Sequence, residues 1–425
     1  MRINPVAGQA TRERMGGMNQ AAGIYLSIPF CKAKCSFCNF ASDVFAASRM
    51  QGYIDRLCAE IRAARAVARS RGAAFPDSFD SIYFGGGTPS LLEPALFRQI
   101  FDCLRDEFAF TGMPEITVEC APGQLSDATL EELQRQGMNR LSFGVQSFVD
   151  RETSAVGRLH SPQDCLDELA RVGRAGVGRL ALDLIVGLPH QTAESWLHSV
   201  DQAITSGVEH VSVYMLEVDE DSRLGREALA HGSRYHAPHL PDEDAAADWY
   251  VAACERLADA GIEQYEISNF ARTGGESRHN LKYWSRDPYL GFGLDAHSML
   301  HTSASQTQAV RWANTSDFDA YLGSPSNNPL AARFVPSSKP EVDRVDEDAA
   351  FEETMFLGLR LNRGIDLDSV QAKFGISRVA AMLEGLRDVE TAGLVEGQGN
   401  RLRLTDRGRM VSNEVFSRLL LQPAT

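Results

Sequence analysis

The chain lacks an apolar run of membrane-spanning length, because no stretch of its 425 residues approaches the roughly 20 apolar residues that a transmembrane helix needs. Its first 22 residues also lack the apolar centre of a signal peptide, and their polar, Gly- and Ala-rich composition predicts a disordered tail. These absences predict a cytoplasmic protein. They leave reversible contact with a membrane surface open.

Positive charge is also scarce. The chain holds 42 Lys and Arg residues against 57 Asp and Glu residues, which gives a formal net charge of −15. An acidic surface is repelled by phosphate backbones and anionic headgroups, so we expect no nucleic-acid partner. The net charge does not exclude an anionic ligand in a local basic pocket.

Cysteine is the third scarce residue, with eight in the whole chain. Eight cysteines are too few for the disulfide framework of a secreted scaffold of this length. Three of them are nevertheless clustered, as Cys31, Cys35 and Cys38 in a C-x3-C-x2-C arrangement. Clustered thiols in a cysteine-poor chain indicate metal chemistry in a reducing compartment.

Three thiolates at this spacing can coordinate three corners of a [4Fe–4S] cubane. The fourth iron is then free to bind the amine and carboxylate of S-adenosylmethionine, a cofactor that carries radical chemistry. A zinc site normally needs four ligands, and no fourth lies nearby. A disulfide is disfavoured in a reducing compartment, and a redox C-x2-C pair would not need Cys31. We therefore predict that Cys31, Cys35 and Cys38 ligate the cluster.

Short apolar runs alternate with helical stretches from residue 24 onward. Six of the runs resemble strands buried on both faces: 24–30, 79–86, 115–122, 140–147, 179–189 and 210–218. The residue types at Ser126, Ser161 and Thr192 predict N-caps for helices between these strands. Repeated strand–helix alternation predicts an α/β fold with a parallel sheet that closes into a barrel or a partial barrel.

Unusual residues fall at the carboxyl ends of these predicted strands, where barrels place their chemistry. The cysteine cluster follows the first strand, and the glycine-rich segment 85–90 follows the second. Gln146, Arg158 and Asp183 lie at or after later strands, and we consider them candidates for binding ribose hydroxyls and a carboxylate. Each of the three alone could equally have a structural role, and their shared position at one edge favours function.

The rest of the chain divides into further regions. We expect a disordered tail over 1–22, a partial barrel over 23–235, an extension over 236–335 and a C-terminal domain over 336–425. Within the extension we expect a helix over 242–260 and a strand over 262–270. The segment 324–347 is rich in Ser, Asn, Pro and charged residues, and this composition predicts a linker. The last region resembles a winged helix, and we interpret it as a lid that packs on the rest of the protein rather than as a nucleic-acid-binding domain.

Seven segments together resemble the radical S-adenosylmethionine proteins related to oxygen-independent coproporphyrinogen oxidase: YLSIPFCKAKCSFCNF, YFGGGTPS, LSFGVQSF, GRLH, DLIVGLPHQT, YEISNFAR and HNLKYW…YLGFGLDAHS. The similarity runs from about residue 24 to residue 418. It implies an incomplete (β/α)6 barrel with a small C-terminal helical domain. It also implies a set of residues that line the S-adenosylmethionine site: Tyr25, Phe37, Gly86, Thr88, Glu119, Gln146, Arg158 and Asp183.

Within that family the chain is most similar to the HemW-like heme chaperones. The related oxidases carry a further cysteine where this chain has Phe40, and they have a longer N-terminal arm. Many relatives have His where this chain has Ser27, so the tuning of the cluster is expected to differ here. The resemblance implies heme as cargo and heme-accepting respiratory proteins as partners, with an unidentified electron donor. It leaves a homodimer open.

The segment HNLKYW is associated with heme in that family, and a heme site needs an axial ligand and aromatic walls. His279, Tyr283 and Trp284 are the heme candidates, because side chains at i and i+4 share a helix face. His297 is a second candidate ligand. In the alternative interpretation, His279 and Asn280 hold a loop by hydrogen bonds and Trp284 fills the core.

Three functions therefore compete. The first is a heme-binding chaperone that delivers heme to acceptor proteins. The second is an oxygen-independent coproporphyrinogen III oxidase, or another radical enzyme that acts on a tetrapyrrole. The third is a binding module that keeps its cluster for structure or sensing. Phe40 and the short N-terminal tail favour the first.

Overall fold

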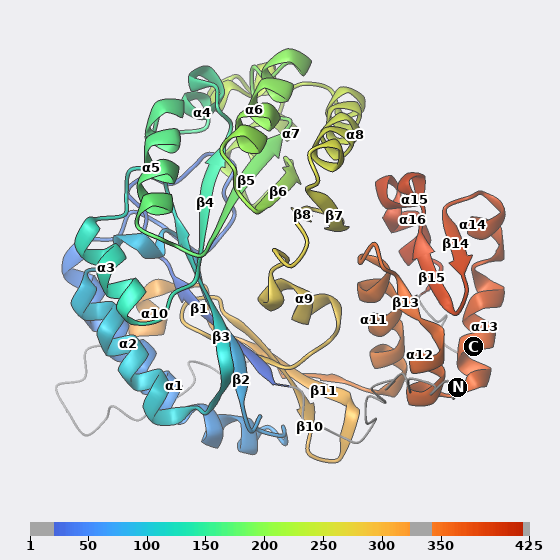
Figure 1. Cartoon of the computed structure of the whole chain (residues 1–425). Coiled ribbons are helices and arrows are strands. Elements are labelled where there is room, and N and C mark those ends of the chain that lie inside the picture. The colour runs from blue at the N-terminus through green and yellow to red at the C-terminus, as the bar shows by residue number, and fades with distance from the viewer. Residues whose placement is uncertain (1–20, 324–341, 420–425) are drawn as a thin grey trace, which may run out of the picture.

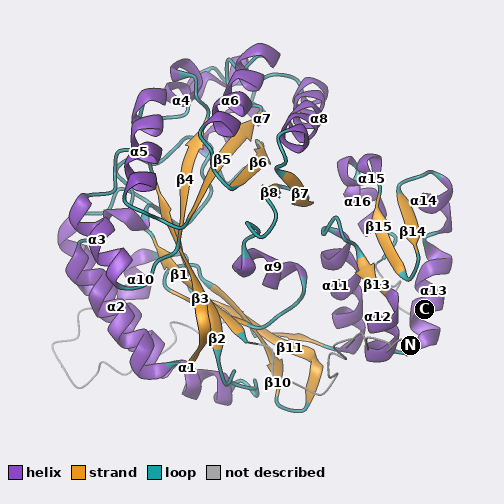
Figure 2. Ribbon diagram, viewed as in Figure 1, coloured by secondary structure: helices purple, strands orange, loops and turns teal. Residues whose placement is uncertain are grey.

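The structure is a computed structural model, and it describes residues 21–323 and 342–419. Most of the predicted tail over 1–22 and most of the predicted linker over 324–347 lie outside these residues. Figure 1 shows a curved sheet with helices around its outer side and a smaller body formed by the C-terminal residues. Figure 2 shows the same arrangement by secondary structure.

Six parallel strands form the centre of the fold, in the order β1 to β6 along the sheet. They are β1 Ala22–Ile28, β2 Phe79–Gly86, β3 Phe110–Cys120, β4 Arg140–Gln146, β5 Arg179–Val186 and β6 His210–Met215. The connecting segments hold α1 Met50–Ser70, α2 Pro94–Glu107, α3 Asp127–Arg135, α4 Asp150–Ala155, α5 Pro162–Arg174 and α6 Ala193–Thr205, with the short 3-10 turns η1 Ala47–Arg49 and η2 Pro89–Leu91. The predicted incomplete (β/α)6 barrel is confirmed.

The local sequence signals explain where these helices start. Ser161 and Asp164 form a reciprocal capping box at the start of α5, with Pro162 at the first helical position. Thr192 caps α6 in the same way. Alternate residues of β1, such as Ile24 and Leu26, are fully buried on the helix-covered face. Their neighbours on the other face point into the barrel, and this face carries the functional side chains.

Both edges of the parallel sheet are extended. On one edge β6 pairs with β8 Asn269–Ala271, which forms an antiparallel hairpin with β7 Glu263–Glu266. The single strand expected over 262–270 is therefore wrong. The chain reverses at residues 267 and 268, where the Glu266 carboxylate accepts a hydrogen bond from the Ser268 amide. Between β6 and β7 lie α7 Arg223–Leu229, η3 Arg234–His239 and α8 Glu243–Asp259, the last close to its predicted range.

On the other edge β1 pairs in parallel with β9 Tyr289–Phe292. β10 His297–Thr302, β11 Ser305–Ala313 and β12 Asp343–Val345 then continue the sheet in antiparallel fashion. The short helix α9 Arg278–Trp284 precedes β9, and α10 Phe318–Leu322 follows β11. These strands carry no sequence signal that we identified, and they bring residues 289–297 beside the first barrel strand.

The C-terminal residues form a second hydrophobic core. Its helices are α11 Glu347–Leu359, α12 Leu367–Phe374, α13 Ile376–Gly385, α14 Arg387–Thr391, α15 Asp406–Met410 and α16 Ser412–Phe416. They pack on an antiparallel sheet of β13 Ile365–Asp366, β15 Arg401–Leu404 and β14 Val395–Gln398. This is the predicted small helical domain with a β-wing. Among the described residues, no helix is both long and apolar enough to cross a bilayer.

Candidate functional site

The three clustered cysteines lie in the loop after β1. The loop is fixed at both ends by backbone hydrogen bonds, from Cys31 N to Asp43 O and from Asp43 N to Pro29 O, each 3.0 Å long. All three thiols are free of disulfides. Cys35 is 8% exposed, whereas Cys31 and Cys38 are half-buried. The spacing therefore places three thiols on one short, anchored loop at the carboxyl end of the barrel.

These thiols open into a cavity of about 360 Å³, which we name the cysteine cavity. All three cysteines line it, and so do seven of the eight residues implied for S-adenosylmethionine binding: Phe37, Gly86, Thr88, Glu119, Gln146, Arg158 and Asp183. The eighth, Tyr25, lines a neighbouring cavity instead. Asp219 also lines the cysteine cavity and was not singled out from the sequence.

Polar groups surround the thiols. The Arg158 guanidinium donates to Cys35 Sγ at 3.5 Å and to the Gly144 carbonyl, while its Nε has no hydrogen-bond partner among the described atoms. Thr88 Oγ1 donates to Cys31 Sγ at 3.9 Å. Burial raises the pKa values of the Cys31 and Cys38 thiols. A metal must therefore displace protons from these thiols as it binds.

Two half-buried carboxyl groups face the same space. Burial raises the pKa of Glu119 to about 7, with a further contribution from the nearby Asp183 carboxylate. Tyr83 OH donates to Glu119 Oε1 at 2.8 Å and counteracts part of this shift. Burial also raises the pKa of Asp183, although Ser212 and Ser142 donate to it. Carboxyl groups held in this way can accept hydrogen bonds from ligand hydroxyls.

Steric contacts explain why glycine occupies positions 86 and 87. Gly86 adopts φ +102°, a conformation that side chains disfavour, and a Cβ there would lie 3.0 Å from Ser27 Oγ. A Cβ on Gly87 would lie 2.8 Å from the Phe30 carbonyl oxygen. Glycine therefore lets the segment after β2 pass directly under the cysteine loop and form the floor of the cavity.

The donor chemistry of the cysteine cavity fits an iron–sulfur cluster and a small zwitterionic ligand. Three thiols supply sulfur donors, Arg158 can pair with a carboxylate, and Glu119 and Asp183 can accept from hydroxyls. Over residues 21–323 and 342–419, no three Cys, His, Asp or Glu side chains are placed to hold a single metal ion. In a cubane each thiolate takes its own iron.

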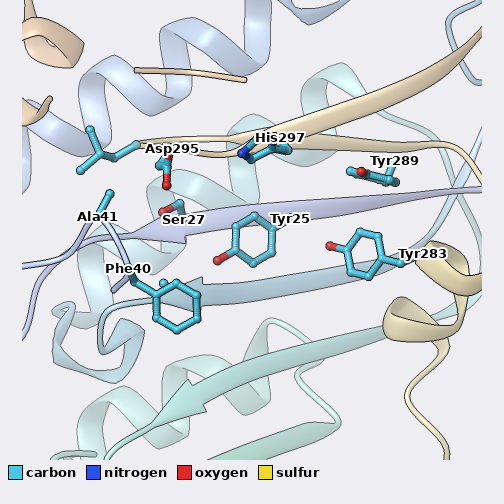
Figure 3. Close-up of a pocket in the computed structure, with 10 residues that line it drawn as sticks. Tyr25, Ser27, Phe40, Ala41, Tyr283, Tyr289, Asp295 and His297 are labelled. Carbon is cyan, nitrogen blue, oxygen red and sulfur yellow. The ribbon is translucent and has the colours of Figure 1, made fainter. Parts of the chain in front are cut away.

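A second cavity of about 340 Å³ adjoins the first, and we name it the aromatic cavity (Figure 3). Phe40 and Gly86 line both cavities. Its other lining residues come from the first barrel strand, the cysteine loop, α9 and the β9–β10 region: Tyr25, Ser27, Ala41, Tyr283, Tyr289, Leu294, Asp295 and His297. Tyr283 and His297 were candidates from the sequence, but no sequence pattern placed them in one cavity with Tyr25 and Tyr289.

The three heme candidates on α9 have different surroundings. His279 is 1% exposed, and burial lowers its pKa to about 3. Its Nδ1 lies 3.0 Å from Ser81 Oγ, and its Nε2 lies 2.9 Å from Tyr283 OH. Tyr283 is half-buried and faces the aromatic cavity. Trp284 is stacked under the Arg360 guanidinium at 4.5 Å and does not line that cavity.

Residues 25–203 match the family model of the radical SAM superfamily, and residues 345–411 match that of the HemN C-terminal domain. The heme chaperone HemW of Bacillus subtilis is 32% identical over 93% of this chain and 98% of the relative. HemW of Escherichia coli is 33% identical over 64% of this chain and 69% of the relative. The solved structure of coproporphyrinogen III oxidase (HemN) from Escherichia coli, 21% identical, covers 94% of this chain with a TM-score of 0.75, which shows the shared fold. The chain belongs to the HemW family of radical SAM proteins.

Proposed function

We propose that this chain is a heme chaperone that binds heme in the aromatic cavity and passes it to acceptor proteins. The observation that carries this proposal is the aromatic cavity itself, with a histidine and three tyrosines on its walls beside the cysteine cavity. Concave, largely apolar sites with a few polar groups are the usual binding sites for flat organic ligands. The names of the curated HemW relatives support the same function.

Membership of the radical SAM superfamily implies a [4Fe–4S] cluster and S-adenosylmethionine. In our proposal Cys31, Cys35 and Cys38 hold the cluster, because all three face one cavity. The cluster supplies an electron and an open coordination position when it is bound. The residues implied for S-adenosylmethionine surround the thiols, which supports placing that cofactor in the cysteine cavity.

Phe40 supports a chaperone over an oxidase. Its side chain is 61% exposed and forms part of the wall between the two cavities. The related oxidases carry a cysteine at this position. An aromatic ring here extends the apolar surface available to a porphyrin, and it adds no thiol to the cysteine cavity.

The test is a hemin titration of anaerobically purified protein with iron and sulfide reconstituted, followed by the Soret band. We expect a saturable shift at one heme per chain. Coproporphyrinogen turnover is measured on the same sample with S-adenosylmethionine and a reductant, and we expect none. A reconstituted protein without any Soret shift would contradict the chaperone proposal.

A second candidate function is oxidation of coproporphyrinogen or another radical reaction on a tetrapyrrole. It is favoured by the cysteine cavity, in which seven of the eight implied S-adenosylmethionine residues lie together. Release of 5′-deoxyadenosine together with consumption of coproporphyrinogen would establish it. In the chaperone proposal the acceptors are heme-binding respiratory proteins, and heme transfer to an apoprotein of that class is the corresponding assay.

A further inference from the structure

Tyr283 is the aromatic-cavity residue whose hydroxyl has a buried imidazole partner. Its OH lies 2.9 Å from Nε2 of His279. The other ring nitrogen of His279 lies 3.0 Å from Ser81 Oγ on β2, and the backbone amide of His279 donates to Glu115 Oε1 at 3.0 Å. A seryl oxygen can accept from Nδ1–H, which leaves Nε2 free to accept the phenol hydrogen.

The tyrosine ring itself is held in a defined orientation. It packs edge-on against Tyr289 with ring centroids 4.7 Å apart, and edge-on against His279 at 5.3 Å. Figure 3 shows the Tyr283 hydroxyl directed toward Tyr25, across the aromatic cavity. The hydrogen bonds that link Ser81, His279 and Tyr283 therefore orient the phenol oxygen of Tyr283 toward the aromatic cavity.

His279 cannot itself reach a ligand in this arrangement. Both of its ring nitrogens are engaged, and its ring packs against the first strand, where a Cβ on Gly23 would lie 3.1 Å from Nδ1. The ring has no room to turn toward the aromatic cavity without losing both hydrogen bonds. Its role in this geometry is to orient the tyrosine.

From this geometry we infer that the phenolate oxygen of Tyr283 is the axial ligand of ferric heme, and that His279 is its positioning residue. The inference rests on the proposed heme-binding function. Tyrosine is an established ligand of heme iron in proteins. As the Fe–O bond forms, the phenol O–H bond breaks and a proton leaves to water, with no change in the oxidation state of the iron. The imidazole then takes its other neutral tautomer, in which Ser81 Oγ–H donates to Nδ1 and Nε2–H donates to the phenolate oxygen.

The other cavity residues have features that separate them from Tyr283. Tyr25 is hydrogen-bonded to Ser27 and lies against the Gly85 backbone, where a Cβ would meet its ring at 3.0 Å. His297 is exposed at the start of β10, beside Asp295. It is the competing ligand, and an imidazole–iron bond has a different spectroscopic signature from a phenolate–iron bond.

The test compares hemin complexes of the full-length wild type with those of Tyr283→Phe, His297→Ala and His279→Gln. We expect the wild-type ferric complex to show phenolate–iron modes in resonance Raman spectra. Tyr283→Phe keeps the ring and its packing, and should lose these modes and bind hemin at least tenfold more weakly. His297→Ala should keep them. His279→Gln should shift their frequency, which a purely structural role would not do.

Tyr235→Phe provides the matched control, because Tyr235 lies in η3 and outside the aromatic cavity; we expect its spectrum to equal the wild type. Circular dichroism and Tm verify that each variant is folded. Wild-type spectra without phenolate modes, or modes that persist in Tyr283→Phe, would overturn the ligand assignment. Imidazole signals that disappear in His297→Ala would assign the iron to His297. A wild type that binds no hemin would instead refute the proposed function.

Discussion

The cysteine cavity and the aromatic cavity share Phe40 and Gly86 but are built in different ways. The cysteine cavity takes its three thiols from eight consecutive residues and its polar groups from the carboxyl ends of successive strands. The aromatic cavity joins the first barrel strand to residues 283–297, which reach it only because β9 pairs with β1. The residues of the cysteine cavity can therefore be predicted from local sequence motifs. The residues of the aromatic cavity cannot, because they come together only through the pairing of β9 with β1.

The largest effect should come from removing a thiol. Cys35→Ala leaves two of the three thiols, and two rarely hold a cubane, so we expect almost complete loss of bound iron and sulfide. Hemin binding should persist, because Cys35 does not line the aromatic cavity. Iron and sulfide analysis together with a Soret titration measures both.

Cys254→Ala is the matched control, since Cys254 lies on α8 and lines neither cavity. Its iron content should equal that of the wild type. Undiminished iron and sulfide in Cys35→Ala would contradict the ligand assignment. Loss of heme binding along with the cluster would show that the two cavities do not act separately.

Phe40 and Gly86 line both cavities and form the wall that the cavities share. A change at Gly86 should therefore affect both. Gly86→Ala forces a side chain into φ +102° and places a Cβ 3.0 Å from Ser27 Oγ. We expect the free energy of unfolding to fall by about 1–3 kcal/mol, with weaker binding of both S-adenosylmethionine and hemin. Urea unfolding and two titrations provide the measurement. Gly52→Ala, in α1 with no atom near the added methyl group, should be neutral or slightly stabilising.

The free energy of unfolding should depend on pH through Glu119, a carboxyl group of the cysteine cavity that has no counterpart in the aromatic cavity's heme candidates. The folded pKa of Glu119 is raised to about 7, so folding favours its protonated form. The resulting stability is fully present below the ordinary Glu value, near 4.5, and is lost as pH rises through about 7. Relative to Glu119→Gln, the wild type should therefore lose about 2 kcal/mol between pH 5 and 8, allowing for the partial exposure of the group.

Urea unfolding of the anaerobic protein at several pH values measures this difference. Glu131→Gln removes an exposed carboxyl of α3 and serves as the control. A constant difference between the wild type and Glu119→Gln across this range would contradict the raised pKa.

The same contrast explains how much the sequence could predict. The six barrel strands, the caps at Ser126, Ser161 and Thr192, and the C-terminal β-wing were predicted from periodicity, capping chemistry and turn residues. The grouping of cysteines with Gly86, Glu119 and Asp183 followed from the rule that parallel strands present their carboxyl ends at one edge. These features depend on local chemistry or on one topological rule.

The burial of His279 could not be predicted in this way. Its i, i+4 spacing correctly indicates contact with Tyr283, but its second hydrogen bond comes from Ser81 on a distant strand. Which face of α9 enters the barrel depends on packing against β1 and β2. The turn that divides β7 from β8 and the strands β9 to β12 were missed for a related reason, because they are short and stabilised by pairing with neighbours rather than by a strong periodicity of their own.

The smallest effect should come from the exposed part of the shared wall. Phe40→Ala removes an aromatic ring that is already 61% exposed, so only its buried part can contribute to ligand contact. We expect hemin affinity to fall by about fivefold, or about 1 kcal/mol, with iron content unchanged, because the backbone of the cysteine loop is fixed by its own hydrogen bonds. Val44→Ala, in the same loop and 57% exposed, lines neither cavity and should bind hemin like the wild type. Equal hemin affinity in the two variants would place the porphyrin away from Phe40, and lost iron in Phe40→Ala would mean that the ring supports the cluster loop rather than the heme.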